Sequence, residues 1–124
     1  MIFLVYAHKF LMVLTAALLI YAVSKAYARG ENWFAQHQKF ATLGVTFGLF
    51  GFAAMVVFKL GMGYPHFKSL HSLAGLIAVL SFTGAPLAGK LLVSGKKSLR
   101  TMHIMGGRFA VLVAIISVII EVIH

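Results

Sequence analysis

Long runs of apolar residues, separated by short polar stretches, dominate the chain. Four such runs cover about residues 2–23, 34–58, 70–93 and 102–123. Each is about 20 to 25 residues long, enough for an α-helix to cross a hydrocarbon layer of about 30 Å. A lipid-embedded span must satisfy its backbone groups internally, which favours helices over open sheets. The pattern therefore predicts four transmembrane helices.

The connections between the runs are short and carry the glycine, proline and charged residues that end helices. They read SKAYARGEN, KLGMGYPHFKS and SGKKSLR. Short connections make consecutive helices antiparallel. The expected fold is an all-α membrane protein, a single up-down bundle of four transmembrane helices over residues 1–124. Residues 26–28 look like a signal-peptide cleavage site, but no basic residue precedes the first apolar run, so a retained span is expected.

Composition agrees with a membrane protein and narrows its chemistry. The 124 residues are 61% hydrophobic, and the mean hydropathy is +0.98, which is unusual for a soluble domain. The sequence has eleven Lys and Arg residues but only two acidic residues. The basic residues flank the apolar runs, so membrane topology explains this positive charge better than a nucleic-acid partner does. The sequence has no cysteine, which excludes disulfides, thiolate catalysis and iron–sulfur ligation.

The distribution of basic residues predicts the orientation in the membrane. Eight fall at one face of the expected bundle and three at the other: Lys25, Arg29, Lys39, Lys90, Lys96, Lys97, Arg100 and Arg108 against Lys9, Lys59 and Lys68. Basic residues concentrate on the cytoplasmic side of membrane proteins. The first and third connections are therefore expected in the cytoplasm, and both termini outside.

Four of the six histidines repeat a position, one near the start of each run. They are His8, His37, His71 and His103, at intervals of 29, 34 and 32 residues. Because successive helices run in opposite directions, His8 and His71 share the outer face, and the other two share the cytoplasmic face. In an up-down bundle the members of each pair lie on diagonal helices and can point across the core. Two imidazoles at one depth favour a bis-histidine haem, so two such sites are predicted.

Three glycines near these histidines could leave room for a macrocycle. Gly75 and Gly107 each follow a histidine by four residues, and Gly44 lies two turns beyond His37. Each is also expected as a helix-packing residue, because membrane helices use small residues to approach closely. Gly44 and Gly48 together form a small-xxx-small motif, so whether this face joins two copies of the chain in a homodimer is left open.

Other site chemistries fit the sequence less well. A single histidine near a helix end is more often a hydrated interfacial residue than a ligand, so the haem interpretation depends on all four together. A zinc site needs three or four ligands at one depth, whereas these histidines divide into two pairs. Proton transport would use carboxylates buried in the spans, but Glu31 lies in a connection and Glu121 is nearly terminal.

The motifs around the histidines resemble those of the cytochrome b561 family, which are transmembrane di-haem electron carriers. The family signature Ser-Leu-His-Ser-Trp, followed by a glycine two residues on, is similar to SLHSLAG at residues 69–75. Its His-Pro-Leu-Leu-Met is similar to HKFLM at residues 8–12, and its late histidine with a glycine four residues on is similar to His103 and Gly107. The resemblance covers the family's four-helix haem core, nearly this whole chain. The departures at Lys9 and Leu73 indicate a distant, prokaryotic branch and hence a bacterial inner membrane.

The resemblance implies two haem b groups, one held by His8 and His71 and the other by His37 and His103. It implies electron transfer from a small cytoplasmic donor, ascorbate or quinol, to an outer acceptor such as ferric iron. Contacts with the donor and acceptor are expected at His66 and Lys68 outside and at Lys96, Lys97 and Arg100 inside. The lysines that the family carries before the ligand equivalent to His37 are missing here. The sequence leaves open whether the chain is itself an oxidoreductase of the ferric or quinone reductase type.

A second class of function is a membrane anchor or assembly subunit of a larger respiratory or photosynthetic complex, with one haem or none. The short connections favour it, because they leave little surface for a dedicated substrate site. Its partners would be other membrane subunits, with quinone handled near the cytoplasmic haem.

Overall fold

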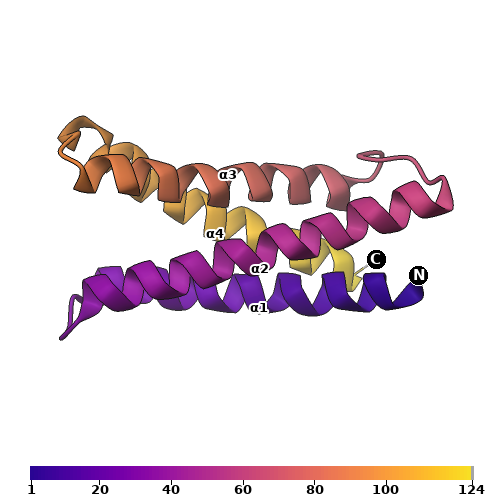
Figure 1. Cartoon of the computed structure of the whole chain (residues 1–124), viewed down its shortest axis with the longest axis horizontal. Helices are drawn as coiled ribbons and strands as arrows, with labels where there is room; N and C mark the ends of the chain where they lie inside the picture. The colour runs from indigo at the N-terminus through magenta and orange to yellow at the C-terminus, as the bar shows by residue number, and fades with distance from the viewer. Residues whose placement is uncertain (124) are drawn as a thin grey trace.

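The computed structural model describes residues 1–123 and contains four long helices joined by short connections (Figure 1). Helix α1 spans Ile2–Ala28, α2 spans Trp33–Met62, α3 spans Leu70–Val93 and α4 spans Arg100–Ile123; a 3₁₀ helix, η1, covers Lys97–Leu99. All four long helices are apolar enough to cross a membrane. The all-α four-helix bundle predicted from the sequence is confirmed.

The helix ends follow from local backbone chemistry. Helices α1 and α2 extend beyond the apolar runs 2–23 and 34–58, because a helix can continue through polar residues where it leaves the hydrocarbon. Arg29 caps the C-terminus of α1: its backbone is left-handed and its N–H donates to the Lys25 carbonyl. Gly63 caps α2 in the same left-handed conformation. Helix α3 begins with a capping box, in which the hydroxyls of Ser69 and Ser72 each accept the other residue's backbone N–H.

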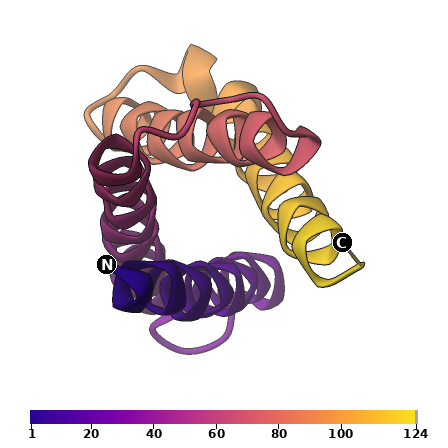
Figure 2. The ribbon, with the colours of Figure 1, turned by 90° about the vertical axis from the view of Figure 1, so that its right-hand side faces the viewer.

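Seen end-on, the four helices occupy the sides of a square, with α1 opposite α3 and α2 opposite α4 (Figure 2). Packing around this square is uneven. Helix α1 packs along α2 and α3 packs along α4, whereas α1 meets α4 and α2 meets α3 at far fewer points. The molecule therefore consists of a first hairpin, α1–α2, and a second hairpin, α3–α4. Helix α1 begins and α4 ends at the same end of the bundle (Figure 1).

A small apolar core joins the two hairpins near the middle of the helices. It consists of Leu19, Ala78, Val79, Phe82, Ala110, Val113 and Ala114. Most other large apolar side chains are exposed in the chain by itself. This is expected of helices whose outer faces contact lipid, because lipid tails are as apolar as the side chains that they meet.

Buried glycines bring the helices of the first hairpin close together. Gly44 and Gly48 of α2 are buried; Gly44 faces α1, whereas Gly48 faces both α1 and Phe82 of α3. A Cβ atom at Gly44 would lie 3.0 Å from Leu19 Cδ2, and one at Gly48 would lie 2.6 Å from Phe82 Cζ and 3.0 Å from Thr15 Cγ2. The face that the sequence left open as a homodimer contact is thus covered by this chain's own side chains.

Replacing Gly48 with leucine should destabilise the fold. The new side chain would have to displace Phe82 and Thr15, and overpacking of this kind costs about 1–3 kcal/mol or more. We expect a lower apparent melting temperature for the detergent-solubilised protein, measured by circular dichroism. Gly84→Leu is the matched control, because among the described residues a Cβ at Gly84 would meet no atom within 4 Å apart from its chain neighbours and the nearby backbone of its own helix. Equal stability of the two variants would contradict this packing.

Candidate functional site

The four repeated histidines form two pairs, one at each end of the bundle. The ring centroids of His8 on α1 and His71 on α3 are 6.1 Å apart, and the ring planes meet at 86°. The centroids of His37 on α2 and His103 on α4 are 5.9 Å apart, also at 86°. Each pair joins diagonally opposite helices. The structure therefore brings together the same pairs that the sequence predicted.

Each imidazole is fixed by a hydrogen bond between its Nδ1 and a backbone carbonyl of the other helix in its own hairpin. The Nδ1 to oxygen distances are 2.9 Å for His8 to Gly51, 2.8 Å for His37 to Ala22, 3.0 Å for His71 to Ser117 and 2.7 Å for His103 to Ala85. Because a carbonyl oxygen only accepts, Nδ1 must carry the proton in each ring. A neutral imidazole in this tautomer keeps its lone pair on Nε2. In all four rings Nε2 is therefore the free nitrogen, the one through which the ring could bind a metal.

The acceptor residues share one property: they are small and buried. They are Gly51, Ala22, Ser117 and Ala85. A small side chain lets the ring of the neighbouring helix reach the backbone. Gly89, one turn after Ala85, extends this clearance, because a Cβ there would lie 2.7 Å from His103 Cε1 and 2.9 Å from its Nδ1. Sequence reasoning missed these residues, since which small residue faces which histidine depends on the register of the two helices.

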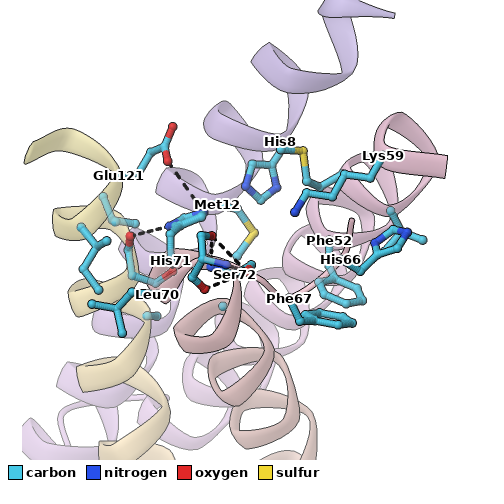
Figure 3. A pocket seen from close by; sticks show the side chains of 18 of the residues that line it. His8, Met12, Phe52, Lys59, His66, Phe67, Leu70, His71, Ser72 and Glu121 are labelled. Carbon is cyan, nitrogen blue, oxygen red and sulfur yellow. Dashed lines mark hydrogen bonds and ion pairs between the residues drawn. The ribbon is translucent and has the colours of Figure 1, made fainter. Parts of the chain in front are cut away.

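A cavity of about 570 Å³ adjoins the His8–His71 pair (Figure 3). Apolar side chains such as Phe52 and Met55 line much of it, together with Gly75. A Cβ at Gly75 would lie 3.7 Å from Ser117 Oγ, an ordinary contact. The site thus combines two imidazoles with a mainly apolar wall, the environment that a flat organic cofactor requires.

The two outer residues predicted to contact an acceptor differ in position. His66, from the α2–α3 connection, lines the cavity (Figure 3). Lys68 is exposed beside it in the same connection and is not among the lining residues. Lys59, near the end of α2, does line the cavity and was missed, because the sequence placed it only as a flanking charge.

A charged pair that the sequence did not single out also lies at this end. Lys9 Nζ is 3.0 Å from Glu121 Oε1, and Glu121 Oε2 is 4.0 Å from His71 Nε2. Glu121 was set aside as nearly terminal, yet it lines the cavity. The up-down order of the helices could have indicated this position, because it brings the end of α4 to the same end of the bundle as the beginnings of α1 and α3.

The remaining predicted residues lie away from this cavity. Gly44 packs against Leu18 and Leu19 of α1, so helix packing accounts for it. At Gly107, a Cβ would meet no atom of residues 1–123 within 4 Å apart from its chain neighbours and the nearby backbone of its own helix. The predicted donor-contacting residues are exposed just before or at the start of α4, at the end of the bundle that holds His103: Lys96, Lys97 and Arg100.

The spacing of each pair fits an iron held in a macrocycle. Among residues 1–123, no group of three or more His, Cys, Asp or Glu side chains is arranged to hold a metal ion. A haem iron needs only two axial ligands from the protein. A bond between a metal and an imidazole nitrogen is about 2 Å long at zinc. Two such bonds would account for about 4 Å of the 6.1 Å between the ring centroids of His8 and His71. The two ring radii account for the rest.

The fold and the site define a class of protein: a four-helix membrane protein with a diagonal histidine pair at each end. The family model described as eukaryotic cytochrome b561 matches residues 1–123. The chain belongs to the cytochrome b561 family, which confirms the resemblance seen in its motifs. No curated protein and no solved structure matches the chain.

Membership of this family indicates transmembrane electron transfer and haem b binding. The four apolar helices indicate an integral, multi-pass membrane protein. Because the matching model describes eukaryotic proteins, it gives no support to the predicted bacterial inner membrane.

Gly89→Ala should weaken haem retention at the His37–His103 pair. The added methyl group would push His103 away from the Ala85 carbonyl, and loss of an orienting hydrogen bond typically weakens a metal site about 10- to 100-fold. We expect a lower haem-to-protein ratio in the purified variant, measured by the pyridine haemochrome method. Gly84→Ala, on the exposed side of the same helix, is the control and should keep the wild-type ratio. Equal haem-to-protein ratios in the two variants would show that Gly89 is not needed to make room for the ring of His103.

Proposed function

We propose that this protein carries electrons across the membrane through two bis-histidine haem b groups. His8 and His71 hold one group through Nε2, and His37 and His103 hold the other. The observation that supports this most strongly is that both ring pairs, with centroids 6.1 and 5.9 Å apart, have every Nδ1 bonded to a carbonyl. Haem held by these histidines would supply reversible one-electron chemistry.

The direction of transfer that we propose runs from the His37–His103 end to the His8–His71 end. Eight of the eleven basic residues belong to the first of these ends, which supports a cytoplasmic position for it and an outer position for both termini. The exposed cations Lys96, Lys97 and Arg100 suit an anionic donor such as ascorbate, with quinol as the alternative donor.

We place the acceptor, ferric iron or a similar oxidant, at the mouth of the outer cavity. His66 supports this position, because it lies on the cavity wall in the connection between α2 and α3. Lys68 is exposed in the same connection and adds positive charge there. An electron leaving the outer haem would reach solvent at this mouth.

Histidine substitutions should divide into two classes. The purified wild-type protein should contain two b-type haems per chain, and His8→Ala and His71→Ala should each remove the same one. His37→Ala and His103→Ala should each remove the other. Redox-difference spectra with a haem count measure both properties, and His66→Ala is the control that should keep two haems.

A folded, colourless preparation would contradict the proposal. Loss of the same haem from His8→Ala and His37→Ala would contradict the pairing. If the protein lacks haem and co-purifies with other membrane subunits, the anchor function would be favoured instead.

The proposed haems also link the two hairpins. Each histidine is anchored inside its own hairpin, while each pair takes one ring from the first hairpin and one from the second. Direct packing between the hairpins is sparse outside the small central core. Ligands that bind only the assembled state stabilise it. Haem binding should therefore hold the hairpins in their relative position.

Removal of haem should loosen the hairpins relative to each other while leaving each one intact. Because the sequence has no cysteine, spin labels can be placed without background at exposed positions. The pair Ile20→Cys and Leu91→Cys spans the two hairpins, and the control pair Ile20→Cys and Leu43→Cys stays within the first. We expect pulsed EPR of haem-free protein to show a broadened distance distribution for the first pair only. Equally narrow distributions for both pairs would argue against this role.

A further inference from the structure

The position of Glu121 is unusual for a carboxylate. The sequence has only two acidic residues; Glu31 lies in the α1–α2 connection, so Glu121 is the one acid in the four long helices. It occupies the last turn of α4, where the helix dipole is negative and disfavours an anion. A residue that violates a local rule of this kind is often kept for a functional reason.

Two contacts define what this carboxylate does. One oxygen pairs with Lys9 at 3.0 Å. The other lies 4.0 Å from Nε2 of His71, the nitrogen proposed to bind iron (Figure 3). The Glu121 and Lys9 side chains are 41% and 51% exposed, so the pair that joins Lys9 to this cavity-lining carboxylate is partly open to its surroundings. Lys9 therefore helps to hold the Glu121 carboxylate beside the ring of His71.

We propose that Glu121, positioned by Lys9, lowers the reduction potential of the haem at the His8–His71 pair. This inference rests on the proposed function. A ferric bis-imidazole centre carries one more positive charge than the ferrous one, so a nearby carboxylate stabilises the ferric state more. Fixed charge beside the centre is one of the means by which a protein sets haem potential. A lower potential makes the outer haem a better electron donor to its acceptor.

The other ionisable groups on this cavity do not supply the same effect. Lys59 lines the wall and, as a cation, acts in the opposite sense, and His66 carries no negative charge in either protonation state. Glu121 is thus the one anion among the lining residues. No carboxylate of residues 1–123 other than Glu121 forms an ion pair, and the exposed residues Lys96, Lys97 and Arg100 at the His37–His103 end are cations, so the effect is expected at one haem.

Spectroelectrochemical titration of the two-haem protein at one fixed pH tests the proposal. Glu121→Gln keeps the size of the side chain and removes its charge. We expect it to raise the midpoint potential of one haem, with about a tenfold change in that haem's ferrous-to-ferric ratio at constant applied potential. The affected haem should be the one that His71→Ala removes. Lys9→Gln should shift the same haem in the opposite direction, because Glu121 then acts without its counter-ion.

Glu31→Gln is the matched control, since it removes the only other acidic charge and should leave both potentials unchanged. Two haems with unchanged midpoints in Glu121→Gln would overturn this inference but leave the proposed function intact. Equal shifts of both haems would also overturn it, because the effect would then come from net charge. If Glu121→Gln loses the outer haem, the potential of that haem in Lys9→Gln becomes the deciding measurement. An unshifted potential in Lys9→Gln would overturn the inference, because Glu121 would then have only a structural role.

Discussion

A hydrogen bond from an imidazole to a carbonyl of the neighbouring helix is the interaction on which this structure depends. An ionisable ring within a membrane span needs a partner, and each of the four rings finds one in the antiparallel helix of its hairpin. The bond fixes the hairpin register, requires a small residue at the acceptor position, and leaves Nε2 as the free nitrogen. One contact type thus connects helix packing to ligand chemistry.

This arrangement explains why packing within the hairpins is tight and packing between them is sparse. Small residues such as Gly44, Gly51 and Ala22 let the helices in one hairpin approach closely. A flat cofactor between hairpins needs the opposite: distance across the diagonal and an apolar wall. The core around Phe82 keeps the hairpins in contact only near mid-length, which leaves space at the His8–His71 end for the cavity.

The fold and the histidine pairs could be predicted from the sequence, because both follow from periodicity along the chain. Four apolar runs determine four helices, short connections determine the up-down order, and that order places His8 with His71 and His37 with His103. The supporting residues could not be predicted, because they depend on helix rotation and register. The roles of Gly89 and Ala85 can be recognised only when His103 of α4 is known to pack against them.

The two ends of the bundle share a scaffold but differ in charge, and under the proposed function this difference would give electron transfer a direction. Each end offers the same imidazole pair, diagonal helices and backbone anchors, so the ligand sets alone would favour neither end. The surroundings break this equivalence: exposed Lys96 and Lys97 make one end attractive to anions, whereas Glu121 places a negative charge beside the ring of His71 at the other. Because fixed charges act on both encounter rates and potentials, the proposed electron transfer would use this asymmetry to favour donor binding at one end and electron release at the other without any change in the ligands.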